Sequence, residues 1–246
     1  MSNRAASPTL RDPSAVHRSI CLCLLALAGR PAVVRAQVEL QGFFGSSVSL
    51  PTPLTITQQG EPDLHFTAHW ATRPFLDTWY YGGRIGLWSG NRGWLFDFTH
   101  HKIYLTNGPA EVQKFRITNG MNLFTVSRGF RHGRFSYAIG GGPVITFPVN
   151  RVRDRRLTGD GGFWGGYYLS GANLMASATR QFPVAAGLFF SLDGRLSATY
   201  VRIPVAGGHA SVPNLALHFH AGLGYTIGKG GRNGGNGERE AGRESP

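Results

Sequence analysis

The stretch 79–105 constrains the fold of this chain most, because its two arms can pair as a hairpin whose faces agree. A two-residue turn at 90–91 pairs residues whose numbers sum to 181. Arg84 then lies opposite Asp97, on a face that is otherwise small and polar. The other face is apolar and carries Ile85, Leu87, Trp94, Phe96 and Phe98. The stretch therefore predicts an antiparallel strand pair with one apolar and one polar face.

The composition narrows the class of protein. The 246 residues include 35 glycines and 12% aromatic residues, but only 15% charged residues, against about 25% in average soluble proteins. No apolar run reaches the ~18 residues that a membrane-spanning helix needs. These features fit an outer-membrane barrel, whose strands alternate apolar and polar residues. The net charge of +12 would suit a nucleic-acid binder, but no basic motif with stacking aromatics accompanies it, so we expect no nucleic-acid partner.

Residues 1–36 have the pattern of a cleavable signal peptide. Arg4, Arg11 and Arg18 precede an apolar core at 20–28, and small residues at −3 and −1 place cleavage before Gln37. The alternative is a buried helix of a soluble domain, which the basic leader disfavours. Both cysteines fall inside this segment, so the mature chain contains no thiol. Residues 229–246 are rich in glycine and charge and are predicted to be a disordered tail.

Between these segments, residues 37–228 are predicted to form an all-β domain of eight short alternating strands. The expected strands are 38–47, the two hairpin arms, 115–127, 135–147, 172–180, 188–200 and 215–227. On the fourth strand, Asn119 interrupts the apolar face of Phe115, Ile117, Met121 and Leu123, which predicts a bulge. Short links alternate with longer ones at 49–78, 106–114, 148–171 and 206–213, and the stretch 64–70 inside the first of these allows a local strand. This pattern predicts an eight-stranded antiparallel transmembrane up-and-down β-barrel with short periplasmic turns. A soluble lipocalin-like barrel would turn its apolar face inward, whereas here small and charged residues suit a narrow interior.

With these strands, segment 37–228 resembles the eight-stranded outer-membrane barrels of the OmpA/opacity type. A narrower stretch, YYGGR at 80–84 with WLFDFTHHKIY at 94–104, resembles barrels identified as lipid A oxidases in alphaproteobacteria. The resemblance implies a Gram-negative outer membrane, with membrane lipid, lipopolysaccharide and the barrel assembly machinery as partners. It also implies lipid A modification at the outer leaflet. The chain departs from the pattern because a polar extension follows Tyr225, where such barrels commonly end on an aromatic residue, and this puts recognition by the assembly machinery in doubt.

Two classes of function therefore stay open at this point. One is a lipid A modifying enzyme, and the other is a non-enzymatic envelope scaffold or a surface-exposed adhesin. A pore is a third reading, which the narrow lumen of eight strands disfavours. Whether the protein is an enzyme is left open by its sequence.

Charged residues on the polar faces predict an ion-pair network in the lumen. A charge that faced lipid would cost about 2–4 kcal/mol at the bilayer midplane, so these side chains should point inward and neutralise one another. A structural plug is favoured over a catalytic acid and base. The expected members are Glu39, Arg84, Asp97, Asp193 and Arg195.

Histidines on the polar faces predict a cluster at the outer mouth of the barrel. His101 should rise to the height of His218 and His220 on the last strand, with His65 and His69 in the first loop above. Imidazoles bind zinc, copper or iron, so a divalent or redox metal is a candidate cofactor. The alternative is that the histidines are hydrogen-bonded fillers of the lumen.

A basic run falls in the third outer loop and is a candidate contact for lipopolysaccharide. Guanidinium groups bind phosphate bidentately, although a solvated loop face explains the run equally well. The residues are Arg151, Arg153, Arg155 and Arg156.

Overall fold

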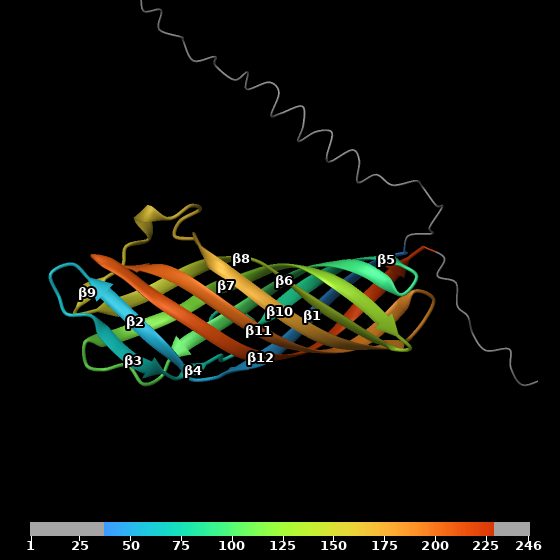
Figure 1. Ribbon diagram of the computed structural model, residues 1–246, viewed down its shortest axis with the longest axis horizontal. Coiled ribbons are helices and arrows are strands. Elements are labelled where there is room, and N and C mark those ends of the chain that lie inside the picture. The colour runs from blue at the N-terminus through green and yellow to red at the C-terminus, as the bar shows by residue number, and fades with distance from the viewer. Residues whose placement is uncertain (1–36, 229–246) are drawn as a thin grey trace, which may run out of the picture. The chain divides into compact units, whose positions relative to one another are not determined.

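The computed structural model describes residues 37–228, which form one antiparallel sheet closed into a ring (Figure 1). The ring order is β1-β5-β6-β7-β8-β10-β11-β12, and β12 pairs again with β1. The ring strands are β1 (Gln37–Ser49), β5 (Tyr81–Ser89), β6 (Arg92–Leu105), β7 (Val112–His132), β8 (Phe135–Val152), β10 (Tyr168–Pro183), β11 (Leu188–Val205) and β12 (Gly208–Ile227). The predicted eight-stranded antiparallel barrel is confirmed, and the signal peptide and tail lie outside the described residues.

The hairpin of β5 and β6 has the predicted register. Arg84 pairs with Asp97, and Ser89 pairs with Arg92 across a two-residue turn. Gly90 begins this turn with φ of 59°, a conformation that a residue with a side chain adopts only at a cost. Within 37–228 no helix is long and apolar enough to cross a membrane, and the short 3-10 helix η1 spans Gly159–Gly161.

Four short strands extend the wall at the end of the barrel opposite the two ends of the described chain (Figure 1). β2 pairs with the start of β12 and with β3, β4 pairs with the end of β6, and β9 pairs with β8. Much of the loop predicted at 49–78 is therefore strand. The bounds are β2 (Thr52–Gln58), β3 (Leu64–Ala68), β4 (Trp70–Ala71) and β9 (Arg155–Arg156).

The loop predicted at 206–213 is also wrong, because β11 and β12 are joined by a turn of only two residues. The predicted loop ends at Pro213, a residue type that rarely lies inside a strand. Pro213 lies where β12 changes partner, between Ser211, which pairs with β2, and Ala216, which pairs with β1. A residue without an N–H is tolerated there because the ladder on that side is interrupted.

An apolar band covers the outside of the barrel. Large hydrophobic side chains alternate with buried polar ones along every ring strand and leave their surface exposed. A closed ring leaves no unpaired edge, which is the condition for crossing lipid with strands. Members of the band include Leu40, Phe44, Ile85, Leu87, Phe96, Val126, Ile139, Leu174, Leu192, Leu196, Phe219 and Leu223.

In the outer part of the barrel the inward positions change from polar to apolar residues. On β11 the interior positions are polar from Ser191 to Thr199, but Val201, Ile203 and Val205 continue them as a buried aliphatic row, while Arg202 points outward. The predicted bulge at Asn119 is present, and the apolar face of β7 beside it points inward rather than to lipid. The outer part of the interior is therefore an aliphatic core of Leu54, Ile56, Ile103, Phe115, Ile117, Met121, Leu123, Val144, Val152, Val201, Ile203, Val205 and Val212.

Candidate functional site

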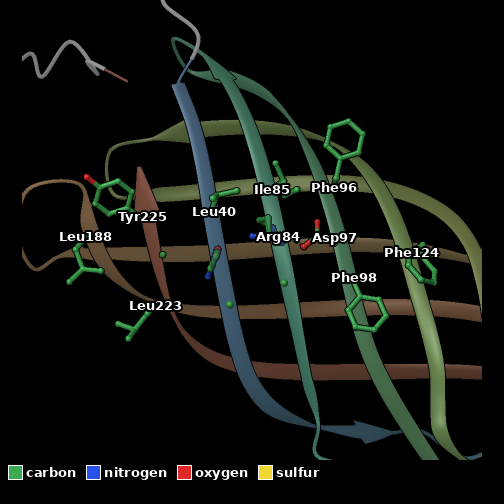
Figure 2. A pocket seen from close by; sticks show the side chains of 14 residues that line it. Leu40, Arg84, Ile85, Phe96, Asp97, Phe98, Phe124, Leu188, Leu223 and Tyr225 are labelled. Atoms are coloured by element: carbon green, nitrogen blue, oxygen red, sulfur yellow. Dashed lines mark hydrogen bonds and ion pairs between the residues drawn. The ribbon is translucent and has the colours of Figure 1, made fainter. Parts of the chain in front are cut away.

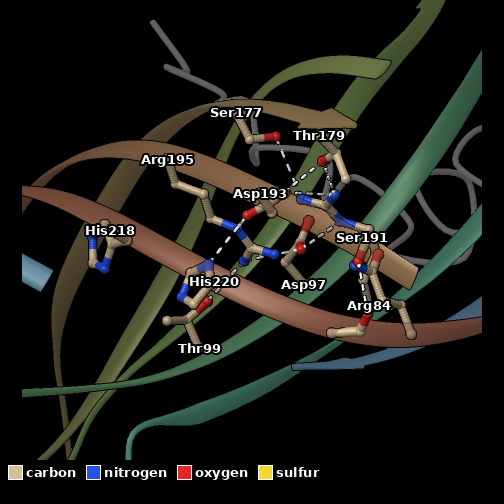
Figure 3. A network of polar contacts seen from close by, with 12 residues as sticks. Arg84, Asp97, Thr99, Ser177, Thr179, Ser191, Asp193, Arg195, His218 and His220 are labelled. Atoms are coloured by element: carbon tan, nitrogen blue, oxygen red, sulfur yellow. Dashed lines mark hydrogen bonds and ion pairs between the residues drawn. The ribbon is translucent and has the colours of Figure 1, made fainter. Parts of the chain in front are cut away.

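Four charged side chains meet inside the barrel as a closed ion-pair cycle (Figure 3). Arg84 Nε lies 2.8 Å from Asp97 Oδ1, and Arg84 Nη1 lies 3.1 Å from Asp193 Oδ2. Arg195 Nη1 lies 3.1 Å from the same Asp97 oxygen, and its Nε donates to Asp193. Each arginine thus contacts both carboxylates, and the four charges sum to zero.

The fold places these groups through strand parity. Arg84 on β5 and Asp97 on β6 occupy paired inward positions. Asp193 and Arg195 occupy inward positions of β11, on another part of the wall. The lumen of eight strands is narrow enough for such groups to touch across it. Thr179 and Thr99 complete the cycle by accepting from Arg84 and Arg195 at 2.8 and 3.0 Å.

Glu39 lies apart from this cycle, contrary to the expected five-membered network. It pairs with Arg131 near the end of the barrel where the chain enters, and it accepts from Gln181 at 3.1 Å. The Arg131 guanidinium lies 3.8 Å from the centre of the Trp88 ring, a close cation–π contact. This second group therefore lies near the short turn between β7 and β8 at 133–134.

The histidines predicted to converge are close together. The ring centres of His101 and His218 lie 5.0 Å apart, and those of His218 and His220 lie 6.0 Å apart. His65 instead lies on the outer hairpin, where its Nδ1 is 3.0 Å from Thr55 Oγ1.

Hydrogen bonds occupy both ring nitrogens of His101 and of His218, whereas His220 contacts Asp193 Oδ1 at 3.1 Å through Nδ1 and its buried Nε2 has no partner among the described residues. His101 Nε2 donates to Asn214 Oδ1 at 3.1 Å, and Ser47 Oγ lies 3.2 Å from His101 Nδ1. His218 Nδ1 forms a hydrogen bond with the Tyr80 hydroxyl. His218 Nε2 forms a second one with Ser197 Oγ at 2.7 Å. Among the residues that the structure describes, no three His, Cys, Asp or Glu side chains are arranged to hold a metal. The geometry favours the hydrogen-bonded filler over the metal centre, which stays a prediction.

The pair of Ser197 and His218 has the distance of a nucleophile and its base, but both side chains are fully buried. The aliphatic core separates them from the outer opening. A substrate in the outer leaflet would have no path to this serine.

The sequence did not single out Tyr80, Ser197 and Asn214, which hold the histidines in place. Their positions carried a usable signal, because each shares inward parity with a residue that was predicted to face the lumen. Tyr80 continues the row of Arg84, and Asn214 continues the row of His218.

The four arginines of the third outer loop lie at the outer end of the wall, and three of them contact groups of this chain. Arg151 pairs with Asp154 at 2.7 Å, and Arg155 pairs with Glu61 at 2.9 Å. Arg153 donates to Gln58 Oε1 at 2.9 Å. Arg156 is exposed on β9. The contacts of Arg153 and Arg155 join the β8–β9 turn to the β2–β3 hairpin.

A shallow apolar groove of about 680 Å³ runs over the outside of β1, β5 and β6 (Figure 2). Gly42 and Gly83 pair with one another and form its floor, since neither projects a side chain toward the lipid. Its sides are apolar and belong to the lipid-facing band. The lining includes Leu40, Ile85, Phe96, Phe98, Leu223 and Tyr225.

No protein-family model matches the chain, and no curated protein matches it. Three solved outer-membrane proteins are similar in structure. OprG from Pseudomonas aeruginosa has a TM-score of 0.44 and 8% identity over 78% of this chain and 96% of its own. Ail of Yersinia pestis has a TM-score of 0.39 and 10% identity over 78% and 99%. AlkL has a TM-score of 0.45 and 8% identity over 79% and 92%.

The class of the protein follows from its own geometry. A closed antiparallel ring, an apolar outer band and a neutralised polar lumen are together the properties of a transmembrane β-barrel. The protein is a small transmembrane β-barrel of the outer-membrane type.

Proposed function

We propose that this protein is a non-enzymatic envelope barrel of the scaffold or adhesin type. The observation that carries the proposal is its filled interior. Paired charges and hydrogen-bonded histidines occupy the lumen inside the apolar band, and aliphatic side chains occupy the interior above it. A barrel filled in this way is rigid, and its functional surfaces are its outer end and its outer wall.

The filled interior argues against a pore. A solute would have to cross the Arg84–Asp193 ion pairs and then the aliphatic core that contains Ile103 and Ile203. Separating buried charges of this kind costs several kcal/mol, and the aliphatic layer offers no polar replacement for water.

The outer end has the properties of a presented surface. Beyond the apolar band, the wall presents polar residues such as Arg202 on its outside. Its inside packs on the aliphatic core, which fixes the shape of the wall. Trp164, in the segment between β9 and β10, is 88% exposed. Exposed tryptophans on a rigid support are frequent anchors of protein interfaces.

Lipid A modification, which the sequence resemblance implied, gains no support from this geometry. The polar groups best suited to chemistry are His101, His218 and Ser197, and all three are fully buried below the aliphatic core.

Mass spectrometry of lipid A from cells with and without the gene tests the proposal directly. We expect identical lipid A in both strains. A lipid A species whose mass depends on the gene would refute a non-enzymatic role.

Two further experiments test the filled interior and the outer end. Planar bilayers that contain the purified protein should show no conductance steps. A Trp164→Ala variant should weaken attachment of the cells to whichever surface the wild type binds.

A further inference from the structure

A cationic cluster lies on the outside of the barrel, where segment 72–80 leaves the wall. β4 and β5 both pair with β6, and segment 72–80 bulges outward between them. Lys102 and Tyr104 point outward on β6 because Ile103 between them belongs to the interior core. We call Arg73, Asp77, Lys102, Tyr104 and Arg116 the outer-wall cluster.

The contacts of the outer-wall cluster hold segment 72–80 against the wall. Lys102 Nζ donates to the carbonyl oxygens of Leu76 and Thr78. Asp77 Oδ2 accepts from the Tyr104 hydroxyl at 2.7 Å and from Arg116 Nη1 at 3.0 Å. The guanidinium carbons of Arg73 and Arg116 lie 5.0 and 5.9 Å from the centre of the Tyr104 ring. The cluster thus contains three cations and one carboxylate, of which only Arg116 pairs with Asp77, and it has an excess of positive charge.

The same segment exposes large apolar side chains. Phe75 is 82% exposed, Trp79 is 59% exposed and Leu76 is 48% exposed. Trp79 packs edge-on against Phe44 of the lipid-facing band, with ring centres 5.8 Å apart. Tryptophans concentrate at the boundary between lipid and water, so Trp79 indicates that the cations lie at the level of the lipid headgroups.

The backbone of the segment is held in an uncommon conformation. Arg73 and Asp77 have φ of 50° and 58°, in the left-handed region that residues with a side chain rarely adopt. Such conformations persist where surrounding contacts fix them, and they cluster at ligand-binding sites. Here the contacts of Lys102 and Tyr104 provide that restraint.

We propose that segment 72–80 and the outer-wall cluster bind the phosphate groups of lipopolysaccharide in the outer leaflet. Arg73 and Arg116 bind the phosphate, because guanidinium is the side chain best matched to it. Phe75, Leu76 and Trp79 insert among the acyl chains. The site is independent of the proposed surface role, and it differs from the arginines at 151–156, three of which contact groups of this chain.

Binding of purified lipid A to the detergent-purified full chain, with a fluorescently labelled protein, tests this site. Each arginine near a charged membrane surface contributes a factor of about five, so R73A/R116A should bind about twenty-five-fold more weakly. R92A/R134A, which removes the same charge from two exposed arginines at the turns of the opposite end of the barrel, should bind like the wild type. Dephosphorylated lipid A should bind the wild type as weakly as lipid A binds R73A/R116A. Equal binding by R73A/R116A and the wild type, or no loss on dephosphorylation, would overturn the proposal.

A second variant gives a gain that misfolding cannot produce. Asp77→Asn removes the carboxylate that competes with phosphate for Arg116, and asparagine tolerates the left-handed backbone at this position. We expect lipid A to bind this variant about five-fold more tightly. If R73A/R116A loses the gel-mobility shift of a folded barrel, Arg73→Ala alone should still bind about five-fold more weakly. Unchanged or weaker binding by folded Asp77→Asn would refute phosphate recognition at this cluster.

Discussion

Arg84 and Asp97 lie directly opposite one another on β5 and β6, and Arg84 Nε donates to Asp97 Oδ1 across 2.8 Å. The same guanidinium reaches Asp193 at 3.1 Å. Replacement of Arg84 with alanine would therefore leave two carboxylates facing the single cation Arg195. Breaking a buried ion pair costs about 3–5 kcal/mol, and Arg84→Ala should destabilise the barrel by that order.

Arg84→Ala with Asp97→Ala should recover much of this loss, because Arg195 and Asp193 then remain as a neutral pair. The free energy of unfolding in detergent and urea measures both effects. Arg92→Ala, an exposed arginine at the periplasmic turn, is the control and should change little. Strictly additive losses in the double variant would show that the two residues do not interact.

The aliphatic core of the outer barrel predicts that truncating an inward isoleucine costs more stability than truncating a lipid-facing one. Ile203 is 1% exposed and packs in this core, whereas Ile139 is 65% exposed on the lipid-facing band. Ile203→Ala should cost about 2–5 kcal/mol, since it opens a cavity, and Ile139→Ala should cost clearly less because lipid fills the space. The temperature at which each variant loses its folded gel mobility checks this. Equal costs would mean that the interior near Ile203 is not packed.

The histidine cluster predicts insensitivity to chelators. Since protein groups bond both ring nitrogens of His101 and of His218, EDTA should leave the unfolding temperature unchanged. His218→Ala should cost about 1–3 kcal/mol for each of the groups that it leaves unpaired, the Tyr80 hydroxyl and Ser197 Oγ. His65→Ala on the exposed hairpin should have little effect. One equivalent of tightly bound metal whose removal lowers the unfolding temperature would reverse this reading.

The sequence predicted the membrane-embedded part of the barrel well because one rule governs it. Lipid outside and a narrow lumen inside force strict alternation, and the tight turn at Gly90 fixes the pairing of Arg84 with Asp97. Parity also put Asp193 and Arg195 inside, although their partners depend on how the ring closes. Glu39 was grouped with them wrongly, because parity gives the direction of a side chain and not its height in the lumen; its partner is Arg131.

The part beyond the membrane was harder to predict because a different rule applies there. Above the band water lies outside, so the apolar residues of β11 move to the inward positions at Val201 and Ile203. Neighbouring strands show the same change from polar to apolar residues at their inward positions, and this change marks where the barrel leaves the lipid. The loop predicted at 206–213 ends at Pro213, but the change of partner along β12 allows this proline inside a strand.

The extended outer wall depends on a close approach of β2 to β12 at Gly208. Gly208 pairs with Gln58, and a Cβ on this glycine would lie 1.9 Å from the carbonyl oxygen of Thr57, a backbone atom that cannot move aside. Gly208→Ala should therefore detach the β2–β3 hairpin locally without unfolding the ring, which is closed separately by β1 and β12.

Proteinase K digestion of the protein in liposomes, followed by mass spectrometry of the fragments, measures this detachment. We expect Gly208→Ala to be cut within residues 52–68 at least several-fold faster than the wild type, while the gel-mobility shift of the folded barrel is retained. Ser211→Ala is the matched control, because Ser211 pairs with Thr55 in the same ladder and its truncation creates no clash. Resistance of Gly208→Ala to the protease would mean that β2 is not held against β12, and loss of the gel-mobility shift would mean that the outer wall is needed for the ring to close.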